Sequence, residues 1–234
     1  MRFIAASALA LLTACSGSDK RSELPSPSGV NAPVEAFAAL RSSGPERFAM
    51  VTPTLYRGGA PSADDLVLLR ALGVTKVVDL RRESLGARRA EHAEARTLGI
   101  EYVEHPYYGV FGTDLAFLDR VLADLRSDDG GAVYVHCSSG EGRTSLVVAL
   151  HRVVHEGWSA ERAWEREALA YGYDATWRNR ELQLTFEDYA YEQTLRRQTT
   201  IASESRVNAI TASVRGSTSG ALVQNTTDQQ TSSP

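Results

Sequence analysis

Apolar residues follow two different spacings along the middle of this 234-residue chain. Three short runs of β-branched and other apolar residues predict strands at 74–80, 100–104 and 132–135. The last run has little polar alternation, which is typical of a strand that is buried on both faces.

Segments with an apolar residue at every third or fourth position predict helices between and after these strands. Leu66, Leu69 and Leu72 follow Ser62, which pairs with Asp65 in a pattern that resembles a capping box. Further helices are predicted at 83–98, 115–125, 144–156, 159–171 and 176–197. Alternating strands and helices predict an α/β fold with a mostly parallel central sheet flanked by helices.

Both ends of the chain are poor in large apolar residues. Residues 15–33 are rich in Ser, Pro and Gly and predict a tether. Residues 198–234 contain no aromatic residue and many Ser, Thr, Asn and Gln, which predicts a disordered polar tail. We therefore expect one folded domain at 34–197.

The first fourteen residues have the layout of an export signal. Arg2 supplies a positive charge and residues 3–12 form a short apolar run. The sequence Leu12-Thr13-Ala14-Cys15 resembles the lipobox of bacterial lipoproteins, in which the cysteine is lipidated and becomes the first residue of the mature chain. We expect a signal peptide at 1–14 and a lipid anchor on Cys15. Ser16 favours the outer membrane, with the protein facing the periplasm of the cell envelope. The alternative is an ordinary signal peptide with an incidental cysteine.

Composition and charge exclude several classes of protein. The formal net charge is −4, whereas a nucleic-acid-binding protein usually carries a surplus of basic residues, so we expect no nucleic-acid partner. The apolar run at 3–12 is shorter than the ~20 residues that span a bilayer. Two cysteines cannot form a disulfide scaffold, and if Cys15 is lipidated the mature chain has a single thiol, Cys137.

The candidate chemistry lies at 136–145, between the predicted strand 132–135 and the predicted helix 144–156. Glycines let backbone N–H groups turn inward, and such a ring beside a helix N-terminus binds anions. The helix dipole, these N–H groups and Arg143 would favour the thiolate of Cys137, which makes it a candidate nucleophile. The expected phosphate-binding residues are Ser138, Ser139, Gly140, Glu141, Gly142, Arg143 and Thr144. This arrangement stabilises a phosphoryl group without a metal or other cofactor, and the Thr144 hydroxyl could hydrogen-bond the sulfur.

The pattern Cys-(five residues)-Arg resembles the signature of the cysteine-dependent protein tyrosine and dual-specificity phosphatases, here with His136 before it and Thr144 after it. Residues 56–61 and 79–81 look like the Tyr-Arg-x-Gly-x-Pro and Asp-Leu-Arg motifs of the compact, atypical bacterial and fungal type. The resemblance covers about residues 56–173. It implies a tyrosine phosphatase-like fold and hydrolysis of a phosphorylated protein or small phosphomonoester through a phosphocysteine.

The resemblance also bears on five other side chains. It implies an aspartate general acid after the strand 100–104, where the only aspartate of the following loop is Asp114. That position also suits a helix N-cap, so Asp114 is either acid or cap, with Glu141 as the alternative acid. We expect Arg57 and Arg81 to form structural ion pairs or loop contacts, the alternative being that they reach the site, and we expect His136 to orient the loop rather than to transfer protons.

Two other interpretations of the loop stay open. Rhodaneses and arsenate reductases also place cysteine and arginine in an anion-binding loop, and a third reading is a phospho-ligand-binding module without turnover. Gly140 with Arg143 and Thr144 favours the phosphatase. His151 and His155 have metal-ligand spacing, but no third ligand is obvious, so we expect ordinary histidines and no metal site.

Overall fold

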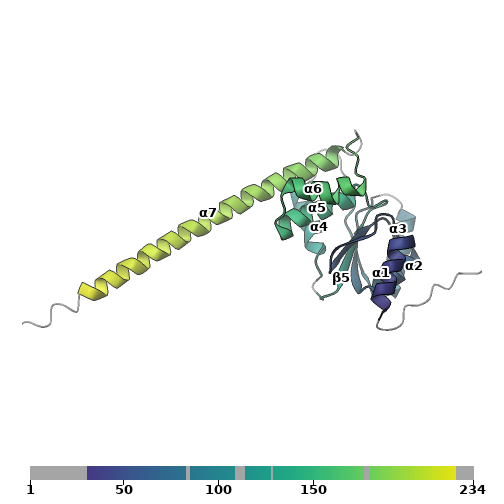
Figure 1. Ribbon diagram of the computed structural model, residues 1–234, viewed down its shortest axis with the longest axis horizontal. Helices are drawn as coiled ribbons and strands as arrows, with labels where there is room; N and C mark the ends of the chain where they lie inside the picture. Colours follow the sequence, from purple (N-terminus) through teal and green to yellow (C-terminus); the bar gives the residue numbers. More distant parts are fainter. Residues whose placement is uncertain (1–30, 83–84, 109–113, 128, 177–179, 225–234) are drawn as a thin grey trace, which may run out of the picture.

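Five strands form the central sheet of the computed structural model, which describes residues 31–82, 85–108, 114–127, 129–176 and 180–224 (Figure 1). The strands are β1 Ala49–Thr52, β2 Leu55–Gly58, β3 Val74–Asp79, β4 Glu101–Glu104 and β5 Ala132–His136. Their order is β1-β2-β5-β3-β4, and all pairs are parallel except β1 with β2. The predicted mostly parallel sheet flanked by helices is confirmed.

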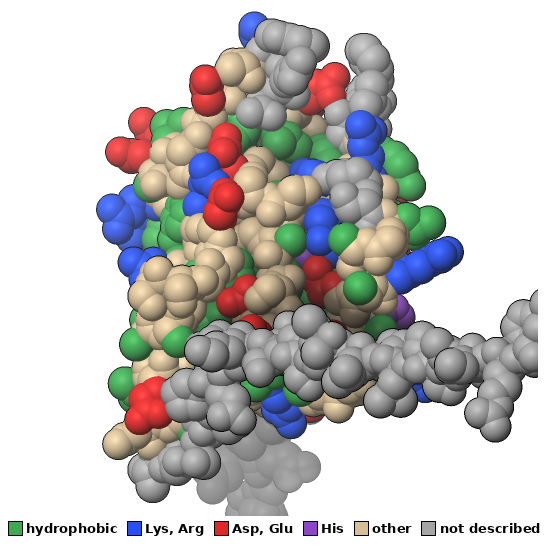
Figure 2. All heavy atoms as spheres, turned by 90° about the vertical axis from the view of Figure 1, so that its right-hand side faces the viewer, with side chains coloured by type: hydrophobic (Ala, Val, Ile, Leu, Met, Phe, Trp, Pro, Cys, Tyr) green, Lys and Arg blue, Asp and Glu red, His purple; other side chains and the backbone are tan. Residues whose placement is uncertain are grey.

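Helices cover the two faces of this sheet (Figure 1). The helices are α1 Ala32–Ser43, α2 Ala63–Ala71, α3 Leu85–Thr97, α4 Leu115–Asp124, α5 Arg143–Glu156, α6 Ala160–Glu167 and α7 Arg180–Gln224, with a 3₁₀ turn, η1, at Leu169–Tyr171. Helices α1, α2 and α3 pack on one face, and α4, α5, α6 and the start of α7 pack on the other. On the face shown in Figure 2, acidic and basic side chains are interspersed.

Strand β5 lies in the middle of the sheet and is buried on both faces. Val133 and Val135 belong to the core beneath α4–α7, whereas Ala132 and Tyr134 belong to the core beneath α1–α3. All of its residues are buried. This explains why its sequence lacks polar alternation, and it places the loop after His136 at the carboxyl edge of the middle of the sheet.

Local signals in the sequence fix the helix ends. The predicted capping box before α2 is present, because Ser62 Oγ accepts from Asp65 N (3.2 Å) and Asp65 Oδ2 accepts from Ser62 N (2.8 Å). Helix α5 ends at Gly157, whose φ of 71° suits a residue without a Cβ. The elements at 32–43, 49–52 and 55–58 were not predicted.

The C-terminal segment differs from the sequence-based expectation. We predicted disorder from residue 198, whereas α7 continues as helix to Gln224. Its side chains between 195 and 212 are exposed. Thr199 and Thr211 donate to carbonyls four residues earlier (3.0 and 2.9 Å), so local bonds satisfy these polar side chains. A segment with few apolar residues cannot contribute to a hydrophobic core, but it can still form the backbone hydrogen bonds of a helix.

The expected signal peptide, the lipidation site Cys15 and most of the tether lie outside the described residues. Within the part of the chain that the structure describes, no helix has both the length and the apolar content to cross a membrane.

Candidate active site

The candidate phosphate-binding loop follows the end of β5. His136 pairs with Gly58 at the end of β2 and with Asp79 at the end of β3, so the carboxyl ends of three parallel strands meet here. Cys137 comes next and is only 2% exposed. Gly142 precedes α5, and Arg143 is the first residue of that helix. The predicted strand–loop–helix context of the motif is therefore present.

Donors outside the loop bind its first four carbonyl groups. The pairs are Cys137 O with His136 Nδ1 (3.1 Å), Ser138 O with Ala60 N (3.0 Å), Ser139 O with Arg47 Nη1 (3.1 Å) and Gly140 O with Arg57 Nη2 (2.9 Å). In a trans peptide the N–H group points away from the carbonyl of the same unit. The N–H groups of residues 138–141 therefore point to the side opposite these donors.

Several N–H groups of the loop have no acceptor in the described part of the chain. Among the described residues, the N–H groups of Ser139, Gly140, Glu141 and Gly142 donate to no acceptor. They stand at the N-terminus of α5, where the helix dipole adds partial positive charge. The N–H groups of Ser139, Gly140 and Glu141, on the side opposite the outer donors, make an anion-binding cradle beside Cys137.

Three glycines let the loop pack against the exit of β2. Gly140 has a φ of 75°, and a Cβ there would lie 2.6 Å from the carbonyl carbon of Gly58. A Cβ on Gly58 would lie 2.3 Å from the hydroxyl of Tyr134, which donates to Gly59 O at 2.6 Å. A Cβ on Gly59 would lie 3.0 Å from Ser138 O, so Gly59 and Gly140 allow the backbone contact that positions the loop, and Gly58 leaves room for the Tyr134 hydroxyl beside it.

Arg143 and Thr144 begin α5 beside the loop. The guanidinium of Arg143 donates to the carbonyl of Leu80 (Nη1 to O, 3.3 Å), the residue that follows β3. Strand β3 is adjacent to β5 in the sheet. Thr144 is buried, and its hydroxyl donates to Gly58 O at 3.4 Å. Contact between Thr144 and the sulfur therefore stays a prediction.

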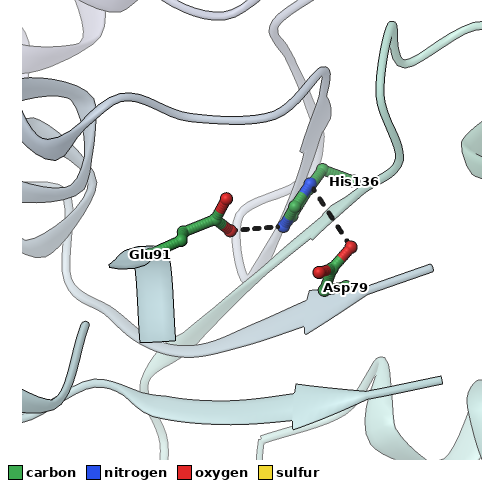
Figure 3. Close-up of side chains that lie close together, drawn as sticks. All are labelled: Asp79, Glu91 and His136. Carbon is green, nitrogen blue, oxygen red and sulfur yellow. Dashed lines mark ion pairs between the residues drawn. The ribbon is translucent and has the colours of Figure 1, made fainter. Parts of the chain in front are cut away.

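His136 lies beneath the loop in a buried charge network (Figure 3). Its Nε2 is 2.8 Å from Glu91 Oε1, and its Nδ1 is 4.0 Å from Asp79 Oδ1. Arg81 binds Asp79 (2.9 Å) and Glu91 (2.6 Å), so the structural ion pairs expected for Arg81 are present. Burial alone would raise the pKa of Asp79. The hydrogen bonds donated by Arg81, together with the electrostatic interaction with His136, outweigh the effect of burial and lower the pKa of Asp79.

Asp79, Glu91 and His136 are also close enough to hold a metal ion, since their donor atoms lie within 4.8 Å of one another. Both carboxylates already bind the Arg81 guanidinium, and Asp79 Oδ2 also accepts from Tyr102 (2.8 Å). A cation would have to displace these donors. The contacts fit an ion-pair network that fixes His136 better than they fit a metal site.

Arg57 and Arg47 support the outer side of the loop. The Arg57 side chain is fully buried and also binds Glu167 Oε2 (3.1 Å). Burial lowers the pKa of Arg57, and the charge of Glu167 opposes that shift. Arg47 pairs with Glu141 Oε2 at 3.0 Å. The expected loop contact of Arg57 is present.

The two candidate acids lie in different places. Asp114 is exposed and caps α4, because its Oδ1 accepts from Ala116 N at 3.0 Å. Residues 109–113, which lead to it, are outside the described part of the chain. Glu141 lies in the loop itself, paired with Arg47. Capping by Asp114 is thus present, and its role as acid stays a prediction.

Sequence reasoning missed several supporting residues. Arg47 belongs to no motif, and Glu91 lies on a helix rich in Ala, Arg and Glu that looks solvent-exposed in sequence. Glu167 likewise gave no signal. All three act through contacts with residues far away in the chain, such as Ser139 and His136.

His151 and His155 lie at the opposite end of β5, beside a cavity of about 560 Å³ that Gly131 also lines. Their ring centroids are 5.0 Å apart. Burial, with the neighbouring His155, lowers the pKa of His151 to about 4.

Comparisons with known proteins identify the family to which this chain is similar. The model of the family described as "DSP-PTPase phosphatase fused to NAD+ Kinase" matches residues 32–185. The dual specificity protein phosphatase TpbA of Pseudomonas aeruginosa (strain PAO1) is 33% identical over 115 residues, which are 49% of this chain and 50% of TpbA. Mouse dual specificity phosphatase 28 is 30% identical over 126 residues, 53% of this chain and 72% of that protein.

Solved structures are similar at lower identity. The crystal structure of P. aeruginosa TpbA has a TM-score of 0.52 at 23% identity and covers 66% of this chain and 99% of that chain. The crystal structure of PTPMT1 has a TM-score of 0.53 at 21% identity and covers 65% and 99%. At these identities the likeness shows the tyrosine phosphatase-like fold. The chain spans half the length of the TpbA sequences it matches.

Proposed function

Because the chain belongs to the DSP-PTPase phosphatase family whose model it matches, we propose that it hydrolyses phosphate monoesters through a phosphocysteine intermediate. The observation that carries the proposal is the cradle beside Cys137. Four loop carbonyls bind outside donors, and the N–H groups at 139–142 have no acceptor among the described residues. Such a cradle binds the oxygens of a phosphoryl group.

The proposed reaction has two displacements. The Cys137 thiolate attacks phosphorus in line, the sulfur–phosphorus bond forms, and the bond to the leaving oxygen breaks. Asp114 donates a proton to that oxygen, which leaves as an alcohol or phenol. Water then attacks the phosphocysteine, Asp114 takes its proton, and inorganic phosphate and the thiolate are released. Arg143 and the loop N–H groups hold the three remaining oxygens throughout.

Asp114 is proposed as the general acid in preference to Glu141, because the Glu141 carboxylate is already paired with an arginine. The carboxylate of Glu141 lies 3.0 Å from the Arg47 guanidinium, and Arg47 also donates to Tyr171 O at 2.8 Å. This contact holds the Glu141 carboxylate on the outer side of the loop. A general acid must instead reach the leaving oxygen of the bound substrate.

The test of the mechanism uses an aryl phosphate in buffer that contains a chelator. We expect the wild-type chain to turn over and Cys137→Ser to show no turnover while it keeps its affinity for phosphate. Activity that survives the substitution would overturn the mechanism. Tight binding of a phosphopeptide without turnover by the wild-type chain would indicate a binding module instead.

The substrate class is proposed as phosphotyrosine-containing or other singly phosphorylated substrates. A solved structure of a TpbA variant contains pTyr, whereas two Arabidopsis thaliana relatives are named inositol diphosphatases. Ser138, Ser139 and Glu141 add no positive charge to the loop of this chain. A multiply charged inositol phosphate would gain little there beyond Arg143. Rates on phosphotyrosine, phosphoserine, inositol phosphate and nucleotide substrates would decide between these classes.

We further propose that the protein acts as a lipoprotein of the bacterial cell envelope, in the outer membrane and facing the periplasm. The Leu-Thr-Ala-Cys sequence that ends at Cys15 supports this location. Incorporation of labelled fatty acid into the wild-type chain and not into Cys15→Ser is expected. Label that persists in the variant would refute the anchor.

A further inference from the structure

Arg57 is the only arginine among the described residues that joins the phosphate-binding loop to the buried carboxylate of Glu167. Its Nη2 donates to Gly140 O (2.9 Å) and Ser145 Oγ (2.8 Å), and its Nη1 donates to Glu167 O (2.7 Å) and Oε2 (3.1 Å). We propose that Arg57 is a positioning residue, which fixes the peptide between Gly140 and Glu141 so that its N–H group faces the bound phosphoryl group. This inference rests on the proposed phosphatase function.

The geometry gives Arg57 control over one peptide unit. A carbonyl pulled toward the guanidinium turns the N–H of the same unit the other way. Gly140 has a φ of 75° and no Cβ, so its own side chain does nothing to restrict this unit. Without the guanidinium, Gly140 O would be left without a charged donor, and the peptide could rotate. A rotated peptide would present an oxygen instead of an N–H to the phosphoryl group.

The surroundings of Arg57 are arranged to hold its guanidinium in one orientation. The side chain is 0% exposed, and the guanidinium carbon lies 3.6 Å from the centroid of the Tyr171 ring. Glu167 supplies the compensating charge from α6. A planar guanidinium can donate in several directions at once, whereas a lysine ammonium is compact and cannot reach Glu167 and Gly140 O together. The Arg57 guanidinium therefore couples the loop to the Glu167 carboxylate on α6 and to the Tyr171 ring.

Arg152 provides a matched control. It binds the other oxygen of the same carboxylate (Nε to Glu167 Oε1, 2.8 Å), and it lies over the Trp158 ring at 4.6 Å. It is mostly buried, and its described contacts include no atom of the loop. Substitution of Arg152 therefore removes an arginine from Glu167 without removing a donor from the loop.

The experiment compares the wild-type full chain with Arg57→Lys, Arg57→Met and Arg152→Met. Tungstate affinity is measured by calorimetry, kcat and KM are measured with p-nitrophenyl phosphate, and stability is measured by urea unfolding. We expect both Arg57 variants to bind tungstate about ten- to a hundredfold more weakly, the range for one charge-assisted hydrogen bond, with a similar fall in kcat. Arg152→Met should lose stability and keep its tungstate affinity within about twofold.

The outcomes separate the two proposals. Wild-type tungstate affinity in a folded Arg57→Lys would overturn the positioning role, and so would an equal loss of affinity in Arg152→Met. If Arg57→Met does not fold, Arg57→Lys decides, because it keeps a buried positive charge. A wild-type chain that binds tungstate without turnover refutes the phosphatase, while weaker binding by Arg57→Lys still supports the positioning role. A wild-type chain that binds no tungstate refutes the positioning role.

Discussion

Replacement of Gly140 by alanine tests how tightly the loop packs on the end of β2. Gly140 has a φ of 75°, and an added Cβ would lie 2.6 Å from the carbonyl carbon of Gly58 and 2.8 Å from Gly59 N. Both contacts are with backbone, which cannot move as freely as the end of a side chain. Either the loop or β2 must therefore shift.

The magnitude follows from two separate contributions. The left-handed backbone conformation costs a residue with a Cβ about 1–2 kcal/mol. Overlap with a packed backbone adds about 1–3 kcal/mol. Gly157 offers the matched control, because its φ is 71° and a Cβ there would meet nothing within 4 Å. We expect Gly157→Ala to lower the free energy of unfolding by about 1–2 kcal/mol and Gly140→Ala by about 2–5 kcal/mol.

Urea unfolding of both variants and the wild-type chain measures these differences. Tungstate affinity, measured in parallel, reports the shape of the loop. Gly140→Ala is expected to bind tungstate at least tenfold more weakly, and Gly157→Ala is expected to bind like the wild-type chain. Equal destabilisation by the two substitutions, with tungstate affinity unchanged in both, would refute the conclusion that the close contact with Gly58 shapes the loop.

Three further predictions concern other parts of the site and fold. Asp114→Asn should lower kcat by about a hundredfold on phenyl phosphate and less on p-nitrophenyl phosphate, whose leaving group needs little protonation, while Glu141→Gln should change kcat less than threefold. If Asp114→Asn and Glu141→Gln changed the difference in kcat between the two substrates equally, this result would contradict the assignment of Asp114 as the acid. Arg47→Gln removes the donor to Ser139 O from a partly exposed side chain, so tungstate affinity should fall about three- to tenfold, less than in the Arg57 variants. Because the pKa of folded His151 is about 4 and that of an unfolded histidine is about 6.5, only the unfolded state gains a proton between these values. The free energy of unfolding should therefore fall by up to about 3 kcal/mol as pH drops from 6.5 to 4, and His151→Gln should remove this part of the slope in urea unfolding at several pH values.

The sequence predicts those parts of the fold that depend on nearby residues. The capping box at Ser62, the helix end at Gly157 and the buried strand β5 each follow from a few adjacent side chains. The strand–loop–helix context of Cys137 follows in the same way. Strands β1 and β2 were missed; each has only four residues, and β2 ends in Gly58, a residue type that is depleted in strands.

The supporting side chains that the sequence did not predict act through contacts between residues far apart in the chain. Arg47 is 92 residues from Ser139, and Arg57 is 83 residues from Gly140. No local pattern marks such a pair, because each partner satisfies the ordinary preferences of its own segment. Glu91 likewise looks like one more solvent-facing acid on α3, yet it is buried against His136.

The contacts of Arg47 and Arg57 share one purpose with those of His136 and Ala60, because all four bind carbonyls on the outer side of the same loop. A cluster of unpaired N–H groups is unstable by itself, since a short glycine-containing loop can rotate its peptides and turn carbonyls toward any vacant space. Four separate donors, from His136, Ala60, Arg47 and Arg57, bind the carbonyls and remove that freedom. The orientation is thus set before any anion arrives, so binding energy is not spent on ordering the loop. It follows that substitutions on the outer side should weaken the binding of tungstate even though none of these groups faces it.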